Sequence, residues 1–439
     1  MEMSFLAIIF VFSLLVVIHE LGHFLAAKWM GVRVERFSVG FPPRLFGKKV
    51  GDTDYCISAI PLGGYVKMSG MIDESMDTEA TGADYEFNSK PIWKRILIII
   101  AGVIMNFILA VFILTMLNYS KGETIIPVTE IGKVGTEGVS QKVGFQVGDE
   151  ILAINEKPVN TWNEVQQEFI RNLNNDIIFT VKRSGINKKL LYKKEWFSQE
   201  KAEHLDIAWM PSSKIGNVLS NMPAKEAGLQ KGDIILQIDD IPVANWLEMT
   251  EIIRNHPGES INIQYKRNDN MFSAEIVPSA MEETDSLGNT IQVGKIGVEL
   301  FYEHKPIAFS TAAVNGFSNT INLIGLNMRA LWWVISGTKS AKEILGGPIM
   351  IAKMAGDAAE AGWDRLWYLI AALSAVLAFF NILPIPALDG GHLTLLIIEG
   401  VLGKPLSTKS KIVVQQVGMA ILLTFIVYIL YVDIGRLLF

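Results

Sequence analysis

Two histidines four residues apart flank a glutamate in the segment His19-Glu20-Leu21-Gly22-His23. On an α-helix the two histidines lie on one face, so both imidazoles can bind one Zn²⁺. Glu20 sits one residue further round and can reach a water on the open side of the metal. The metal would lower the pKa of that water, and the carboxylate would take its proton during attack on a peptide carbonyl.

The surroundings of this motif decide between a metal site and a chance match on a solvated helix. Residues 5–18 are apolar except for Ser13, and the apolar pattern resumes at residues 24–30, so the motif lies in a candidate membrane span. An ionisable side chain inside a bilayer costs about 2.5–3.5 kcal/mol on translocon scales. Three such side chains on one apolar helix need a shared partner, which predicts one zinc ion per chain.

A third ligand is expected from the segment Asn381 to His392, which reads NILPIPALDGGH. Pro384 and Pro386 break helical hydrogen bonding at membrane depth, which is tolerated only where the backbone is buried in protein or lines a wet cavity. A catalytic zinc site has three protein ligands, and Asp389 is the best candidate for the third; its alternative role is a helix cap. Asn381 could stabilise the developing oxyanion or hold the substrate backbone, and its alternative role is a structural bond to the broken helix.

A candidate substrate-binding edge lies at residues 57–68, which read ISAIPLGGYVKM. Pro61 and the pair of glycines suit an edge strand or a bend. A substrate helix must unwind to expose its scissile bond, and an edge strand could hold the unwound segment by strand addition. An ordinary surface hairpin is the alternative. The candidate substrate-binding residues are Gly63, Gly64, Tyr65, Val66, Lys67 and Met68, together with Asn381, Pro384 and Pro386.

The composition of the chain favours a membrane protein with a soluble portion. Its 439 residues are 50% hydrophobic with a mean hydropathy of +0.31, which is too apolar for an ordinary soluble protein of this size. The net charge of −6 comes without a basic domain, which argues against nucleic-acid binding. One cysteine, Cys56, excludes an intramolecular disulfide framework.

Hydrophobic stretches predict four membrane spans, at residues 1–31, 93–120, 364–400 and 411–433. Basic residues cluster at both ends of the predicted loop 32–92, and the positive-inside rule places this loop in the cytoplasm. Both termini and the region between the second and third spans are then outside.

Asn106, inside the second span, is expected to form an interhelical hydrogen bond. Residues 304–350 are rich in asparagine, so we expect an amphipathic helix at the outer membrane surface instead of a full span.

The region between the second and third spans is soluble in character and contains an internal repeat. The segment GFQVGDEIL at 144–152 returns as GLQKGDIIL at 228–236, an offset of 84 residues (228 − 144). Each copy resembles a PDZ domain, and we expect these domains at residues 121–213 and 214–303. PDZ grooves accept an extended peptide end by strand addition; the alternative is a steric gate that binds nothing tightly.

Together, the two motifs resemble the site-2 protease family of intramembrane zinc metalloproteases, and the PDZ pair resembles its bacterial members. The resemblance covers essentially the whole chain. It implies His19, His23 and Asp389 as zinc ligands and Glu20 as the general acid/base, with residues 63–68 in a β-element near the active site. The implied fold is a polytopic α-helical membrane protein with four transmembrane helices, this membrane-associated β-element and two tandem periplasmic PDZ domains.

The same resemblance implies partners and a location. The family cleaves single-span membrane proteins, including signal-peptide remnants and an anti-sigma factor already trimmed by a first protease in the extracytoplasmic stress response. The PDZ tandem would exclude uncut substrates by size. We expect a monomer in the bacterial inner membrane, in contact with membrane lipid and with both termini in the periplasm.

Two other hypotheses are a non-catalytic scaffold that binds peptide ends and a zinc protease that works in a soluble domain. The metal-ligand candidates lie inside the spans, which argues against both.

Overall fold

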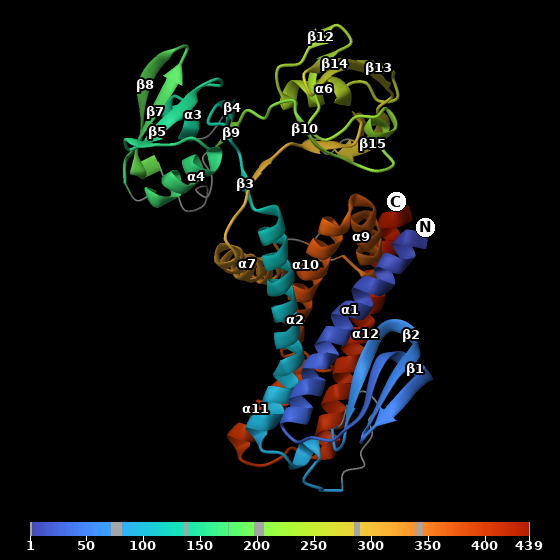
Figure 1. Cartoon of the computed structure of the whole chain (residues 1–439). Helices are drawn as coiled ribbons and strands as arrows, with labels where there is room; N and C mark the ends of the chain where they lie inside the picture. Colours follow the sequence, from blue (N-terminus) through green and yellow to red (C-terminus); the bar gives the residue numbers. More distant parts are fainter. Residues whose placement is uncertain are drawn as a thin grey trace. The chain divides into compact units, whose positions relative to one another are not determined.

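The computed structural model describes residues 2–71, 81–135, 139–173, 175–196, 206–284, 290–338, 340 and 346–438. The chain divides into two compact units. Unit 1 consists of Met1–Gly122 and Ile307–Phe439 and carries the long apolar helices, and unit 2 is Glu123–Pro306 and carries most of the strands. Figure 1 labels the elements of both units.

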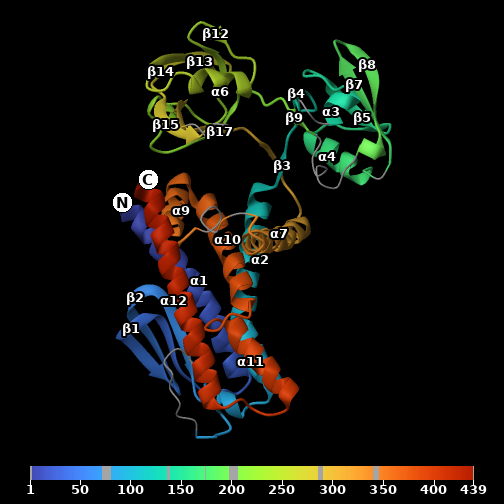
Figure 2. The same cartoon turned by 180° about the vertical axis from the view of Figure 1, so that it is seen from behind.

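Four helices of unit 1 are long and apolar enough to cross a membrane, which confirms the number of spans predicted from the sequence. They are α1 (Glu2–Trp29), α2 (Ile92–Lys121), α10 (Trp363–Ile382) and α12 (Thr408–Leu438). Figures 1 and 2 show them running lengthwise through the unit, with the start of α1 and the end of α12 at the same end. Unit 1 is therefore a multi-pass helical bundle.

The core of the bundle lies between α1, α2 and α10. Leu15 of α1, Ile113 of α2 and Ile370 of α10 are 2%, 4% and 0% exposed, and they belong to one cluster of packed apolar side chains. A polar contact adds to this packing, because the hydroxyl of Ser374 in α10 donates to the backbone oxygen of Asn106 in α2 at 2.8 Å. Close packing and such hydrogen bonds hold membrane helices together, since burial from lipid gives little hydrophobic gain.

The third span breaks at the second motif. Helix α10 ends at Ile382, and α11 (Asp389–Leu402) begins after a loop that holds both prolines. Proline lacks an amide donor and clashes with the preceding helical turn, so residues 364–400, expected as one span, are divided between two helices. Asp389 is thereby the first residue of α11.

The strands β1 (Val34–Val50) and β2 (Thr53–Met68) form an antiparallel hairpin beside α1 (Figure 1). Both strands bend, so that residues 34–39 pair with 64–68 on one side and with 54–57 on the other. Residues 64–68 therefore form an outer edge of the folded hairpin. A 3₁₀ helix, η1 (Phe87–Ser89), lies between the hairpin and α2 in the chain.

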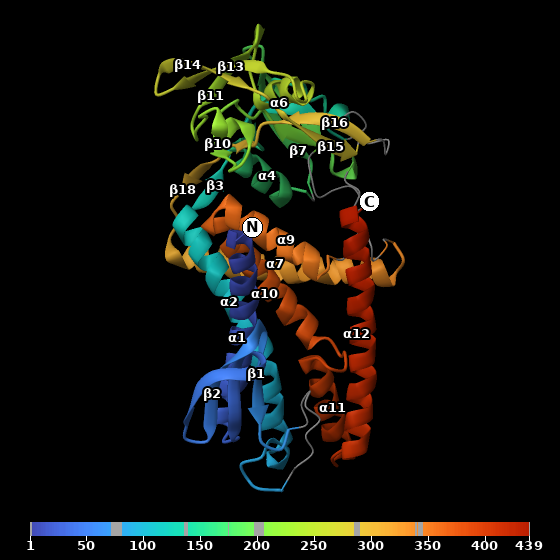
Figure 3. The ribbon, with the colours of Figure 1, turned by 90° about the vertical axis from the view of Figure 1, so that its right-hand side faces the viewer.

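Helix α7 (Phe309–Ile335) lies across the bundle instead of along it, as Figure 3 shows. Its residues Ala312, Gly316 and Thr320 are fully or largely buried, and Gly316 packs against Thr115 of α2. Bulky apolar side chains such as Trp332 stay exposed on the rest of its surface. Helix α7 therefore packs against the bundle through small residues and leaves large apolar side chains on its exposed surface.

Helix α9 (Pro348–Ala361) receives its N-terminal cap from another helix. The carboxylate of Asp433, near the end of α12, is 2% exposed and accepts hydrogen bonds from the backbone N–H groups of Gly347, Ile349 and Met350 at 3.0–3.2 Å. These amides have no partner within α9 itself, because the first turn of any helix lacks one. The contact joins α12 to α9.

Unit 2 contains two copies of a PDZ-like β-rich module. The sheet of the first copy has the strand order β6-β5-β7-β8, and the sheet of the second has the order β12-β11-β13-β14. The first copy comprises β4 (Ile131–Val134), α3 (Val139–Val143), β5 (Glu150–Ile154), β6 (Lys157–Pro158), α4 (Trp162–Arg171), β7 (Ile177–Arg183), β8 (Ile186–Tyr192), η2 (Lys194–Trp196) and β9 (Ile207–Trp209). The second comprises β10 (Ile215–Val218), α5 (Pro223–Glu226), β11 (Ile234–Ile238), β12 (Ile241–Pro242), α6 (Trp246–Arg254), β13 (Ile261–Arg267), β14 (Asn270–Ile276), β15 (Ser279–Thr284), β16 (Thr290–Lys295) and β17 (Val298–Leu300).

The Gly-Asp step of the repeat has the same partner in both copies. Asp149 is fully buried and accepts two hydrogen bonds from Arg183, at 2.6 and 2.7 Å. Asp233, also fully buried, accepts two from Arg267, at 2.7 and 2.8 Å. Paired hydrogen bonds between guanidinium and carboxylate are among the stronger polar contacts. The aspartate of the repeat is therefore a structural residue.

The chain enters and leaves unit 2 through neighbouring strands. Strands β3 (Glu123–Ile125) and β18 (Glu303–Lys305) pair antiparallel, with Glu123 opposite Lys305.

Candidate active site

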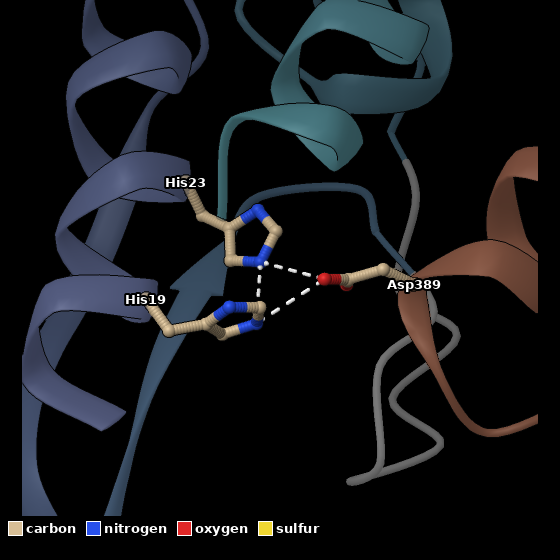
Figure 4. Close-up of side chains that lie close together, drawn as sticks. All are labelled: His19, His23 and Asp389. Atoms are coloured by element: carbon tan, nitrogen blue, oxygen red, sulfur yellow. Dashed lines mark hydrogen bonds and ion pairs between the residues drawn. The ribbon is translucent and has the colours of Figure 1, made fainter. Parts of the chain in front are cut away.

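Three side chains from two helices meet inside unit 1. His19 and His23 come from α1, and Asp389 comes from the start of α11 (Figure 4). The two histidine Nε2 atoms lie 3.2 Å apart, and Asp389 Oδ2 lies 3.2 Å from Nε2 of His19 and 3.4 Å from Nε2 of His23. The side chains are 13%, 7% and 17% exposed in the order His19, His23 and Asp389. Among the described residues, this trio forms a group able to hold a metal ion.

The spacing of the three atoms fits a tetrahedral zinc ion. Zinc binds imidazole nitrogen and carboxylate oxygen at about 2.0–2.1 Å, so neighbouring ligand atoms around a tetrahedral ion lie about 3.3 Å apart. Apart from the two ring nitrogens, Asp389 Oδ2 is a buried oxygen without a hydrogen-bond donor in the described part of the chain. Three electron-rich atoms that converge in this way repel one another unless a cation lies between them. Two nitrogens and one oxygen also match the donor set of known catalytic zinc sites and leave a fourth position open.

The tautomer of His23 is set by the backbone of α2. Its Nδ1 lies 2.9 Å from the carbonyl oxygen of Ile98. A carbonyl oxygen can only accept a hydrogen bond, so Nδ1 carries the proton and donates it. The lone pair of the neutral ring is then on Nε2, the atom that faces Asp389. This is the arrangement that metal-binding histidines adopt in proteins.

Two glycines allow α1 and α2 to come close enough for this contact. A Cβ atom on Gly22 would lie 2.3 Å from the backbone oxygen of Ala101. A Cβ atom on Gly102 would lie 2.4 Å from Nε2 of His23 and 2.7 Å from Cε1 of His19. All three distances are too short for real Cβ contacts, so any larger residue at either position would push the helices apart and displace the histidines.

Glu20 lies beside the β2 strand. It is half-buried, and a Cβ atom on Gly64 would lie 3.8 Å from its Cγ and 3.6 Å from Cγ1 of Val16. About two turns before Glu20, the hydroxyl of Ser13 donates to the backbone oxygen of Pro61 at 2.9 Å. Residues 61–64 thus run along one face of α1, from Ser13 to the side chain of Glu20. The structure therefore brings part of the predicted substrate-binding edge next to the predicted general base.

The other residues of that edge contact their own hairpin. The hydroxyl of Tyr65 accepts a hydrogen bond from Arg36 at 3.1 Å, and the Lys67 ammonium lies 3.6 Å from the carboxylate of Glu35. Val66 and Met68 are buried in a core cluster that also contains residues of α1 and α2. Gly63 and Gly64 are buried as well, and Gly64 lies beside α1.

The loop before Asp389 holds the remaining predicted residues. Asn381 is half-buried in the last turn of α10, and within the described ranges no hydrogen bond links it to the histidines or to Asp389. Pro384 is exposed, whereas Pro386 is half-buried and packs against Gly418 of α12. The structure thus gathers the three metal-ligand candidates, and among the described residues Asn381 has no hydrogen bond to them.

Asn106 of α2 makes the interhelical hydrogen bond expected from the sequence, and its partner is a metal-ligand candidate. Its side-chain amide lies 3.3 Å from Nδ1 of His19 in α1. The sequence showed a single amide side chain in an apolar span, which indicated a hydrogen bond but did not identify His19 as the partner.

Comparisons with known proteins match nearly the whole length of the chain to zinc metalloproteases. The model of peptidase family M50 matches residues 7–425. The chain is 30% identical to the regulator of sigma-E protease RseP of Escherichia coli (strain K12), over 97% of both chains. It is 32% identical to the regulator of sigma E protease of Haemophilus influenzae, over 99% of this chain and 100% of the relative. A Neisseria meningitidis protein with a provisional name as a zinc metalloprotease is 32% identical, over 99% of both chains.

Among solved structures, the PDZ domain of an SdrC-like protein from Listeria monocytogenes is 26% identical, with a TM-score of 0.17. The match covers 21% of this chain and 90% of that domain.

Proposed function

The chain belongs to peptidase family M50 as a zinc metalloprotease, and from this membership we propose that it cuts peptide bonds within or near the transmembrane segments of single-span membrane proteins. The observation that carries the proposal is the convergence of His19, His23 and Asp389 between α1 and α11. Helix α1 is a candidate span, and α11 follows the break in another. A site at this place meets peptide bonds at membrane depth.

The proposed roles follow from the positions of the side chains. His19, His23 and Asp389 hold one zinc ion, and the ion, when bound, polarises the scissile carbonyl and acidifies a water. Glu20 takes the proton of the attacking water and later gives it to the leaving amine. The hydrogen bond to Ile98 keeps the His23 lone pair directed at the site. The three side chains are largely buried, and a low local dielectric constant strengthens the charge interactions between them.

We also propose that the substrate is held in an extended form beside α1. The edge at Gly63, Gly64, Tyr65, Val66, Lys67 and Met68 offers backbone groups for strand addition, supported by the closeness of Gly64 to Glu20. Asn381, Pro384 and Pro386 lie in or beside the loop that leads to Asp389, so the substrate passes along them from the other side. Asn381 would contact the substrate backbone or the developing oxyanion and needs no bond to the metal ligands for either role.

The proposed substrates follow from the family resemblance of the sequence: an anti-sigma factor, already trimmed outside the membrane, is one, and signal-peptide remnants are a second. The first of these fits the names of two relatives, each called a regulator of sigma-E protease. The PDZ domains, at residues 121–213 and 214–303, would exclude untrimmed substrates. The basic loop 32–92 supports an orientation in the bacterial inner membrane with both PDZ domains and both termini in the periplasm. The chain would act as a monomer.

The test is cleavage of a labelled single-span peptide by the purified full chain in detergent, with the cut mapped by mass spectrometry. We expect a cut within or next to the span, abolished by a zinc chelator and restored by added zinc. A non-chelating isomer of the same compound is the control. Cleavage confined to the soluble flanks of the peptide, or unaffected by metal removal, would contradict the proposal.

A further inference from the structure

Helix α2 presents one stripe of residues to the two histidines. Ile98, Gly102 and Asn106 are spaced four residues apart, so they share one face of α2. Helix α1 runs in the opposite direction (Figure 1) and presents His23 and His19 with the same spacing. Ile98 therefore meets His23, Gly102 makes room for both rings, and Asn106 meets His19.

The side chain of Asn106 is buried and incompletely paired. Asn106 is 0% exposed, and its amide nitrogen lies 3.3 Å from Nδ1 of His19. Its amide oxygen is buried with no hydrogen-bond donor among the residues that the structure describes. Leaving a buried acceptor unpaired costs about 1–3 kcal/mol. The backbone oxygen of Asn106 accepts from Ser374 at 2.8 Å, which anchors this turn of α2 to α10.

A half-turn of the amide about the Cβ–Cγ bond gives the amide oxygen a partner. It exchanges the positions of the amide oxygen and nitrogen and brings the oxygen next to His19. Nδ1–H of His19 then donates to this oxygen, and the lone pair of the ring is on Nε2. In the opposite arrangement, Nδ1 accepts from the amide and the ring proton is on Nε2, between His23 and Asp389, where it blocks metal binding.

We propose that Asn106 is a positioning residue for the metal site: its amide oxygen accepts Nδ1–H of His19 and fixes the tautomer and orientation of that ring. This inference rests on the proposed zinc site. It gives His19 the same kind of partner that the Ile98 carbonyl gives His23. Partners of this kind raise the metal affinity of a site by about 10–100-fold.

Two substitutions separate the hydrogen bond from the volume of the side chain. Asn106→Leu keeps a similar volume and removes the acceptor. Asn106→Asp keeps the acceptor oxygen and cannot donate to Nδ1. Asn118→Leu, near the far end of the same helix and outside the stripe, is the matched control. For each full-length variant, the zinc dissociation constant is measured by competition with a chromophoric chelator. The visible spectrum of bound Co²⁺ reports the ligand geometry, and thermal unfolding in excess chelator reports the stability of the metal-free fold.

Asn106→Leu is expected to weaken zinc binding by about 10–100-fold and to alter the Co²⁺ spectrum. Asn106→Asp and Asn118→Leu are expected to bind zinc as tightly as the wild type. Wild-type affinity in Asn106→Leu would overturn the inference. If Asn106→Leu does not fold, Asn106→Asp still decides: retained affinity supports the acceptor role, and a loss of tenfold or more overturns it. Failure of the wild type itself to bind zinc would instead contradict the proposed function.

Discussion

The charges of the individual residues at the site balance once a bound zinc ion is counted. Two neutral imidazoles and the ionised Asp389 carry one negative charge, and Zn²⁺ brings the total to one positive charge. Glu20, beside His19 in the sequence and close to Gly64 in the structure, supplies the compensating negative charge. In a medium of low dielectric constant an uncompensated charge is costly. The neutral sum therefore supports the assignment of His19, His23, Asp389 and Glu20 to one zinc site.

Replacing Glu20 tests its role apart from metal binding. Glu20→Gln keeps the shape of the side chain and removes its ability to take a proton, so the zinc content should stay at the wild-type level. The cleavage rate should fall by about 10²–10⁴-fold, the usual contribution of a general base. Zinc content and peptide cleavage are measured on the same preparation, with Glu123→Gln on the exposed strand β3 as the control. Cleavage at the wild-type rate would remove Glu20 from the mechanism.

The metal-ligand candidates could be predicted from the sequence, because helical spacing places the two histidines together and a carboxylate at membrane depth needs a charged partner. His19 and His23 share a helix face by spacing alone, and Asp389 was the carboxylate left at membrane depth. The contact between Asn106 and His19 could not be predicted, because it depends on how closely α1 approaches α2. The absence of a side chain at Gly22 and Gly102 sets the distance between the two helices, and the hydrophobic pattern of the sequence does not predict that distance.

At the scale of the elements, the repeated module shows why a sequence motif recurs. The aspartates of both Gly-Asp steps are fully buried and paired with an arginine from the third strand of their sheet, β7 or β13. The repeat therefore marked a fold that the structure contains twice. The break between α10 and α11 was also foreseeable in part, because prolines end helices. The return of the chain into α11 directly at Asp389 was not, since it requires the packing of α11 against α2 and α10.

Removing one of these aspartates should loosen one module only. Asp233→Ala leaves Arg267 without its buried partner, and such a loss costs about 3–5 kcal/mol when the pair is fully buried. Because the Arg267 side chain is 23% exposed, we expect the lower end of that range. Hydrogen exchange followed by mass spectrometry on the full chain should show faster exchange in the strands of the second module.

The exposed Asp240→Ala substitution, two residues beyond the end of β11, is the control and should leave exchange unchanged. Equal acceleration in both modules would mean that they do not unfold independently, and no acceleration would remove the structural role of Asp233.

At the scale of the whole molecule, the two units are connected by one pair of strands. Glu123 lies opposite Lys305, so the chain leaves unit 1 and returns to it through neighbouring backbone segments. Paired residues of an antiparallel ladder are about 5 Å apart, a distance that a few residues can bridge. Unit 2 can therefore be removed without stretching the chain of unit 1.

Deletion of residues 123–306 with a short Gly/Ser linker tests the role of the PDZ pair. The deleted chain should keep its zinc, because all proposed ligands lie in unit 1. It should cleave a trimmed single-span substrate as the full chain does, and should also cleave the untrimmed form that the full chain spares. Gel-based cleavage assays with both substrates measure this difference. If the untrimmed substrate stays protected after the deletion, the PDZ domains are not the size filter.

The most direct test of the central claim is the zinc content of the purified wild type and of Asp389→Ala, measured with cleavage of a transmembrane peptide in the same samples. The account predicts about one zinc per chain in the wild type, and a sharp loss of both zinc and cleavage in the variant. Thermal unfolding in excess chelator should be similar for the two proteins, which would show that the fold is intact. Full zinc and normal cleavage in Asp389→Ala would contradict a site shared between α1 and α11.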